Sequence, residues 1–372
     1  MFRNGVAALH AASPPLPPGV RLCLLSSLPP PDAAALLSSF ASSFRSSPPC
    51  ALALLNSALA ADPLCLIVDP GVAVASPLHL LYLLRAERGR SVACHPHVLV
   101  SLGAGSSAHV VEEIASVAPA SGGAPPGVVL HNAVLRAAVG DDARLRHTRL
   151  AAHGVATSTA GAAAATASPV VASICTTLVA QAENSSYELV EATVVASGLA
   201  RHALTVIQRG AATSTRVASF VLSGDGGDGE THTSVGLDHP DSSVAQLHKA
   251  IAASSSSRVV FDGAVRVGRA AQRTDAKQLT RSLLLARRAR AHARPNLCIV
   301  ADDVRCSHGA TVAAIDDEAL FYMLSRGVAE AEAKRALTWS FGAEVVGQME
   351  HKLLRERAEA AARALLTSVG AL

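Results

Sequence analysis

Aromatic residues are scarce in this chain: Phe, Tyr and Trp make up only 3% of its 372 residues, although hydrophobic residues make up 50%. Any core must therefore be built mainly from Ala, Val and Leu. Neither sign of charge dominates, since 32 Lys and Arg stand against 29 Asp and Glu, and this balance argues against a dedicated nucleic-acid binder. The one dense basic run, RRARAHAR at residues 287–294, is expected to be a solvated loop.

Paired cysteines are absent as well. The seven Cys residues are scattered without a Cys-x-x-Cys spacing, which fits a reducing compartment better than a disulfide framework. No G-x-x-x-x-G-K-[ST] sequence occurs, so the chain is not expected to bind ATP through a P-loop. Residues 154–182 carry no charge, but they are mostly Ala, Ser, Thr and Gly with Pro169 among them. We expect small-residue packing or a loop there and no membrane span.

The N-terminal part has the apolar spacing of a helix. Residues 32–61 follow this spacing, and Pro48 and Pro49 divide them into two short helices. One side of the first helix is expected to carry Leu36, Leu37, Phe40 and Phe44.

Short strands are predicted from about residue 62 to residue 310. Apolar and polar residues alternate there in β-branched runs that end at Gly, Asp or Pro. In the run RVVFDGAVRVG, one face is expected to carry Val259, Phe261, Val265 and Val267, and the other Asp262 and Arg266.

The strand pattern limits the fold. Without amphipathic helices between the strands, a doubly wound α/β sheet is excluded, and a sandwich, a barrel or a β-solenoid remains. Small interior residues, few aromatics and Gly, Asp or Asn after each run favour the solenoid. No strict hexapeptide or nonapeptide repeat supports it.

The last part of the chain changes to helical spacing after residue 315. Asp316 is a good N-cap, acidic residues follow in the first turn, and Gly327 is placed to end the helix. We expect a second helix over residues 330–341 and a third over residues 343–367.

A possible pair of metal ligands precedes these helices. Cys306 and His308 stand two residues apart at the end of an extended apolar run, ADDVRCSHGAT. Side chains at i and i+2 of a strand point to the same face, so the thiol and the imidazole are expected to lie side by side. That pairing suits iron, zinc or sulfur chemistry.

Several segments together resemble a known family. They are ADDVRCSHGAT with the following IDDEALFYMLSRG, RTDAKQLTRSLLL at residues 273–285, LDHPDSSVAQLHKAI at residues 237–251, and the short turns in LGAGSSAHVVEE and VGDDARLRHTRL. All of them are similar to segments of the SufB/SufD family of iron–sulfur cluster assembly proteins. The likeness reaches to about residue 350.

This resemblance implies a fold and its parts. It implies a mostly β protein, with a right-handed parallel β-helix (β-solenoid) core and a C-terminal α-helical subdomain. The expected parts are an N-terminal lead-in with short helices at 1–61, the β-helix at 62–310 and the helical subdomain at 311–372. MFRNG and PPGVRLCLLSS look like the segment that leads into the family's β-domain, so the helical region that usually precedes it is expected to be missing.

The resemblance also implies a role, and the SufD-like branch fits better than the SufB-like one. An iron–sulfur cluster normally needs four Cys or His ligands, and Cys306 and His308 supply two at most. The chain would then be a non-catalytic scaffold that shares a transient cluster or iron with a SufB-like partner. Its helical end would dock a SufC-like ATPase, and the chain itself would bind no nucleotide. The docking residues implied are Asp317, Glu318, Phe321, Tyr322, Ser325 and Arg326.

Alternatives stay open at this point. Cys306 and His308 could instead stabilise a structural β-solenoid through zinc, or the solenoid could be a lyase or an acyltransferase. His232, His239 and His248 fit no recognised zinc spacing and are expected to be solvated or turn residues.

Neither nucleic acid nor membrane is an expected partner. Ala and Ser runs suggest a GC-rich algal nuclear gene and hence the plastid stroma, whereas a bacterial origin would mean the cytoplasm.

Overall fold

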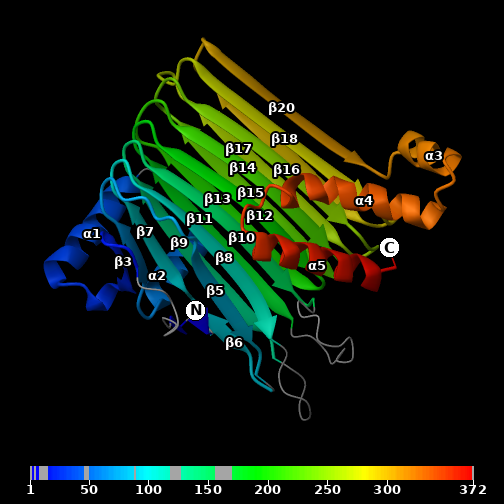
Figure 1. Ribbon diagram of the computed structural model, residues 1–372, viewed down its shortest axis with the longest axis horizontal. Coiled ribbons are helices and arrows are strands. Elements are labelled where there is room, and N and C mark those ends of the chain that lie inside the picture. The colour runs from blue at the N-terminus through cyan, green and yellow to red at the C-terminus, as the bar shows by residue number, and fades with distance from the viewer. Residues whose placement is uncertain are drawn as a thin grey trace.

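The chain winds into a flattened parallel β-solenoid made of two facing sheets (Figure 1). The computed structural model describes residues 2–3, 6–7, 16–45, 50–87, 89–117, 127–155 and 170–370. In spatial order, sheet I consists of β2 (Val6–Ala7), β1 (Phe2–Arg3), β5 (Leu78–Arg85), β8 (Ser107–Val117), β10 (Arg144–His153), β12 (Ser186–Val195), β14 (Ser214–Ser223), β16 (Ser243–Ala252), β18 (Thr274–Leu284) and β20 (Val304–Ala313). Sheet II consists of β19 (Arg290–Ile299), β17 (Arg258–Val267), β15 (Gly227–Leu237), β13 (Gly198–Gln208), β11 (Val171–Gln181), β9 (Val129–Val139), β7 (His97–Leu102), β4 (Leu64–Val68) and β3 (Val20–Leu24), with β6 (Val92–Cys94) beside β9.

Successive long strands alternate between the two sheets, so each coil contributes one strand to each. The coils differ in length: Ser186 pairs with Ser214, 28 residues later, whereas Ser243 pairs with Asp275, 32 residues later. Because this spacing varies, no strict repeat is visible in the sequence although the solenoid prediction is confirmed.

From β8 to β18, a left-handed turn residue lies one or two positions before each sheet I strand. Positive φ angles stack there from coil to coil, and each amide N–H bonds to the next coil, as Asp142 N does to Glu183 O at 2.9 Å. The stacked residues are Gly105, Asp142, Asn184, Ala212, Asp241 and Arg273. Gly, Asn and Asp tolerate this backbone conformation best, which is why Gly and Asp corners mark the coils in the sequence.

The predicted alternation within strands is confirmed. In β17 the residues expected inside are all buried, and Asp262 and Arg266 lie outside, each bonded to an oppositely charged side chain. The loop prediction for the basic run is wrong, and for the uncharged stretch the structure shows small-residue packing and not a loop. Arg290 to Arg294 of the basic run form part of β19, because this segment pairs in register with β17. Val171 to Gln181 of the uncharged stretch form the buried strand β11, while residues 156–169 lie outside the described part.

Short helices occupy the N-terminal part, as predicted: η1 (Leu25–Ser27), α1 (Pro30–Ser43) and α2 (Ala51–Leu59). Phe40 is buried and Phe44 nearly so, but Leu37 is 46% exposed. The apolar line follows every fourth residue through Leu36, Phe40 and Phe44, and Leu37 lies about 100° around the helix from it.

The C-terminal helices are α3 (Asp317–Ser325), α4 (Glu330–Val346) and α5 (Lys352–Ser368). The break expected near Gly342 is wrong, because α4 continues through it. At that point α4 approaches sheet I so closely that a Cβ on Gly342 would lie 2.8 Å from Cζ of Phe220. β20 likewise extends to Ala313, beyond the expected boundary at residue 310.

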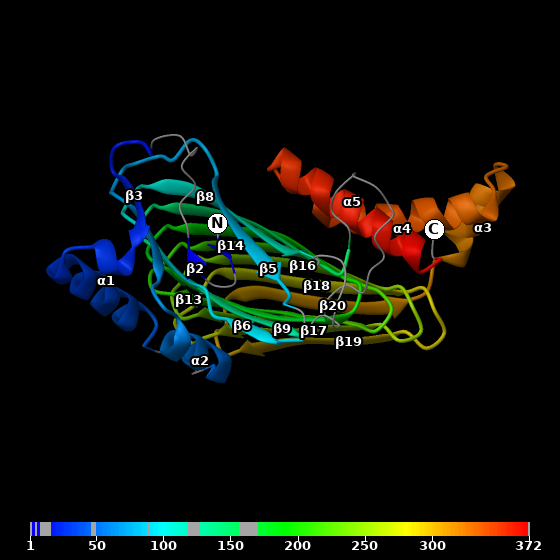
Figure 2. The ribbon, with the colours of Figure 1, turned by 90° about the horizontal axis from the view of Figure 1, so that it is seen from below.

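Two of these helices share a core with the solenoid. α4 and α5 lie across the outer face of sheet I, as Figure 2 shows from below, and bury an apolar cluster against β8 to β18. Lys249 of β16 donates to the carbonyl oxygen of Phe341 at 3.1 Å, and Arg357 of α5 contacts Glu113 of β8 at 2.5 Å. α3 by contrast buries no residue. No helix in the described ranges is long and apolar enough to cross a membrane.

Candidate functional site

The C-terminal end of the solenoid is open. β19 and β20 are the outermost strands of the two sheets, and no strand within the described residues pairs with the free edge of either. Residues of β20 are mostly exposed, whereas the matching residues of β18 are largely buried. The last coil therefore presents two unpaired strand edges and the uncovered end of the interior.

Cys306 and His308 lie at this open end on the same face of β20. Their register partners on β18 are Ala276 and Gln278, which are buried inside the solenoid. Both ligand candidates therefore face the space between the sheets, as the spacing predicts. Cys306 is half-buried against the apolar core, and His308 is exposed.

The pKa of the Cys306 thiol is raised. Partial burial is the main cause and the carboxylate of Asp275 adds to it, while a backbone hydrogen bond involving Ala276 works in the opposite direction. The group is thus a neutral thiol near pH 7, and metal binding would release its proton.

This chain does not complete a metal site by itself within the described residues, which contain no group of three or more His, Cys, Asp or Glu placed to hold a metal ion. Cys298 does not join the pair, because it lies exposed on β19, where the pairing with Arg266 places it on the outer face of sheet II. Cys306 and His308 therefore lie together without a third candidate donor among the described residues.

The three other candidate histidines are not brought together. His232 lies on the outer face of β15 beside Glu230. His248 is buried on the inward face of β16, where its ring stacks on Phe261. His239 follows β15 in a turn, where its backbone N–H donates to the side chain of Gln208. The expectation of solvated or turn residues is wrong for His248, because inward positions of β16 are sealed by β14, β18 and sheet II.

The docking candidates cluster on α3 and its C-terminal end. Asp316 caps the helix by accepting from the backbone N–H of Glu318 at 2.9 Å, as predicted. Phe321 is 71% exposed and Tyr322 is 59% exposed, and the guanidinium of Arg326 lies 5.2 Å from the Tyr322 ring centroid. All six candidates are exposed: Asp317, Glu318, Phe321, Tyr322, Ser325 and Arg326. Neither Phe321 nor Tyr322 is buried against the core of the solenoid.

A buried polar cluster inside the solenoid was missed at the sequence level. Glu112 accepts hydrogen bonds from Tyr82 at 2.6 Å and from His147 at 2.9 Å. Arg149 donates to Glu191 at 3.2 Å, and Glu191 lies 2.7 Å from Nδ1 of His202. All of these side chains are buried.

The neighbouring groups in this cluster keep its two buried carboxylates ionised. Burial by itself raises the pKa of Glu112, but His147, Arg149 and Tyr82 outweigh it and lower the pKa to about 2. Glu191 behaves in the same way, with His202 and Arg149 lowering its pKa to about 2. The only sequence signal was a charged residue at an inward position of a strand, and such a signal depends on knowing which face is inward.

Comparison with known proteins is consistent with this architecture. Residues 84–341 match a family model described as "SUF system FeS cluster assembly, SufBD core domain". The chain is 37% identical to "Protein ABCI7, chloroplastic" of Arabidopsis thaliana over 84% of its own length and 62% of that protein. It is 30% identical to an iron–sulfur cluster assembly SufBD family protein of Synechocystis sp. over 82% of its length and 63% of the relative. The chain thus spans less than two thirds of either of these relatives.

A shorter match is to a relative whose name specifies the SufD subunit. Over 112 residues, which are 30% of this chain and 26% of the relative, it is 40% identical to "Iron-sulfur cluster assembly protein SufD" of Escherichia coli.

Proposed function

The chain belongs to the SufB/SufD family of the SUF iron–sulfur cluster assembly system, and we propose that within it this protein is a SufD-like scaffold subunit. In this role it joins a SufB-like subunit, contributes ligands to a nascent cluster between the two chains and docks a SufC-like ATPase. The cluster is the cargo of the assembly.

The observation that carries the proposal is the pair of donors at an uncovered solenoid end. Cys306 and His308 face the same space, and no third donor joins them among the described residues. A cluster with four protein ligands then requires donors from a second chain. A homologous solenoid that extends the two sheets at β19 and β20 would bring its own donors to this space.

The two donors have different tasks. A neutral imidazole can bind iron through its ring nitrogen, whereas the thiol of Cys306 must first lose its proton. Since the pKa of this thiol is raised, Cys306 becomes a ligand only when iron stabilises its thiolate.

We assign ATPase docking to α3. Its exposed apolar and charged residues have the mixed character of a protein interface. α3 is joined to β20 by residues 314–316 and to α4 by residues 326–329, so a force on α3 acts directly on the strand that carries the donor pair. The nucleotide would be bound by the ATPase, and this subunit would be non-catalytic.

For the compartment we propose the plastid stroma, on the strength of the chloroplastic relative, with the bacterial cytoplasm as the alternative. A zinc site that stabilises this solenoid by itself would need four donors within the chain, and the described residues contain no group of three or more placed to hold a metal ion. No observation favours a lyase or an acyltransferase.

The test is cluster loading of the complex. The chain, a SufB-like subunit and a SufC-like ATPase are purified together without oxygen, supplied with iron and sulfide, and analysed for both after gel filtration. We expect His308→Ala and Cys306→Ala to lower bound iron and sulfide several-fold while the complex still assembles. Cys298→Ala and His292→Ala on the outer face of β19 are matched controls that should load normally. Full loading of the His308→Ala complex would refute the ligand role.

A further inference from the structure

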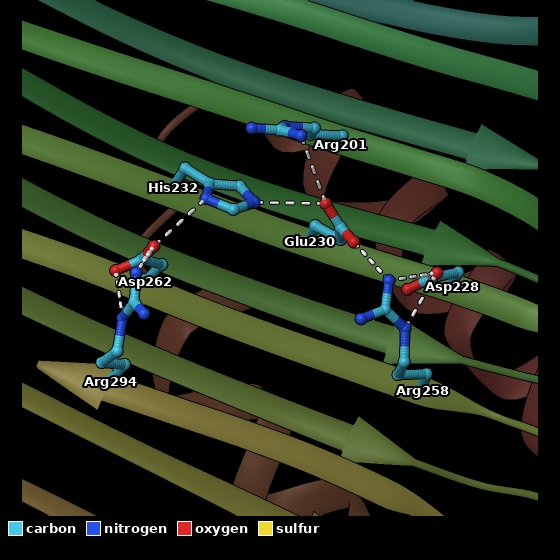
Figure 3. Close-up of polar contacts among 7 residues, drawn as sticks. All are labelled: Arg201, Asp228, Glu230, His232, Arg258, Asp262 and Arg294. Atoms are coloured by element: carbon cyan, nitrogen blue, oxygen red, sulfur yellow. Dashed lines mark hydrogen bonds and ion pairs between the residues drawn. The ribbon is translucent and has the colours of Figure 1, made fainter.

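The outer face of sheet II carries a network of charges that alternate in sign from strand to strand (Figure 3). Arg201 of β13 lies 3.8 Å from Glu230 of β15, and Arg258 of β17 lies 2.5 Å from Asp228. On these inner strands, the arginines of the network face carboxylates on the neighbouring strand. Such cross-strand pairs of opposite charge stabilise a sheet, and like charges directly opposite each other destabilise it.

Within the part of the chain that the structure describes, the alternation of charge has no further strand to continue on beyond β19, the edge strand of sheet II. A second row runs from His232 through Asp262 to Arg294 of β19, where Arg294 bonds Asp262 through two nitrogens at 3.1 and 2.7 Å. Beyond Arg294 there is no further strand in the described residues. Arg290 lies opposite Arg258, and no ion pair among the described residues involves Arg290 or His292. The next strand of this sheet would have to supply carboxylates to continue the pattern.

Neither edge strand has a carboxylate to offer. β19 reads RAHARPNLCI and β20 reads VRCSHGATVA, so the two contain three arginines, two histidines and no Asp or Glu. Arg287 and Arg288 are exposed in the turn before β19. If a second copy of this chain docked through the same end, β19 and β20 of each copy would bring no carboxylate to the other, and the nearest carboxylates, Asp302 and Asp303, lie in the turn before β20.

Pro295 restricts the edge further. The backbone N–H groups of Arg290 and Val300 donate to sheet II neighbours, so by alternation the amide nitrogen of residue 295 faces the free edge. Proline has no N–H, and β19 lacks a donor at this point. Charged residues and proline on an edge strand are means by which proteins suppress unselective strand addition.

We propose that this end selects its partner by charge: it pairs with a subunit whose outermost strands carry carboxylates on their outer faces, and it disfavours a second copy of itself. The inference rests on the proposed function, because it assumes that partner subunits join through these edges. It identifies the partner as a different chain with acidic edge strands. The basic run of residues 287–294 would then be the part of this chain that recognises those carboxylates.

A charge-reversed copy of the chain tests this directly. Wild type and the R290E/R294E variant are studied by sedimentation velocity, separately and as an equimolar mixture, in about 50 mM NaCl. We expect the mixture to associate at least about tenfold more tightly than wild type with itself, and the advantage to fall in about 500 mM NaCl as the charges are screened. The R21E/R45E variant, with the same change of charge at the far end of the solenoid, should give no mixed dimer. Self-association of wild type as tight as that of the mixture would overturn the proposal.

A second arm separates this inference from the proposed function. Binding of the SufB-like subunit should weaken at least about tenfold in R290E/R294E and stay unchanged in R21E/R45E. Equal binding by wild type and R290E/R294E would overturn charge selection and leave the edge interface standing. Absence of any complex with wild type would overturn the proposed function and this inference with it. Micromolar binding of a labelled 20-mer RNA or DNA duplex that R290E/R294E abolishes would assign the arginines to nucleic acid and also overturn it.

Discussion

At the scale of single residues, the interior of this solenoid departs from what its composition suggests. Most inward positions carry Val, Leu or Ala, but Glu112, Arg149 and Glu191 lie opposite one another on three successive strands of sheet I. An uncompensated charge in such a place would cost several kcal/mol. The arrangement persists because each charged group has an opposite charge or a hydrogen-bond donor beside it.

Removing one charge from this cluster should be strongly destabilising. In Glu112→Gln, the side chain keeps its size but Arg149 loses half of its buried counter-charge, and we expect the free energy of unfolding to fall by about 3 kcal/mol. Glu188→Gln is the matched control, because Glu188 is a partly exposed carboxylate 3.4 Å from Arg216, and it should cost less than about 1 kcal/mol. Urea unfolding at pH 7 measures both. Equal effects of the two substitutions would contradict a structural role for the cluster.

At the scale of elements, the three C-terminal helices have different tasks although all three show helical spacing. α4 and α5 bury residues against sheet I, whereas α3 is held by its cap and its connections. α3 buries no residue and exposes two aromatic side chains, and exposed apolar surface of this kind often marks a site of interaction with another molecule.

The docking role of α3 is testable without disturbing the fold. The Phe321→Ala, Tyr322→Ala double variant should recover at least about tenfold less SufC-like ATPase in a pull-down, because aromatic anchors dominate interface energies. Its melting temperature should stay unchanged, since neither side chain packs on the core. Leu353→Ala on α5, also an exposed apolar residue, serves as the control. Undiminished recovery would mean that the ATPase binds elsewhere.

At the scale of the whole molecule, buried histidines make stability depend on pH. His131, His153 and His248 are buried, and burial is the main cause that lowers their pKa values to about 3, 3 and 4. Burial likewise lowers the pKa values of His97 and His109 to about 4. They are neutral in the folded chain but bind protons in the unfolded chain below pH 6.5. Acid therefore favours the unfolded chain.

We expect the free energy of unfolding to fall from pH 6.5 toward pH 4, by up to about 1.4 kcal/mol per pH unit for each histidine. Below about pH 4.5, protonation of Glu112 and Glu191 adds to the loss, because their folded pKa values lie near 2. Urea midpoints between pH 7 and pH 4.5 measure the effect. His248→Leu should flatten the profile by about a fifth, because His97, His109, His131 and His153 also have strongly lowered pKa values, and His292→Leu, on the surface, should not. A profile that is level over this range would contradict the burial of the histidines.

The sequence alone determined the features that depend on neighbours in the chain. Period-two runs, the turn residues, the Asp316 cap and the shared face of Cys306 and His308 all follow from local backbone geometry, which repeats over two to four residues. The tertiary structure decided whatever depends on contacts between coils. Contacts between coils join residues about 30 to 40 positions apart at a spacing that changes from coil to coil, and contacts between the C-terminal helices and sheet I join residues about 100 or more positions apart. No local pattern encodes either kind. These contacts decide that Glu112, Arg149 and Glu191 meet, that Gly342 lies within a helix against Phe220, and that the basic run is a sheet edge.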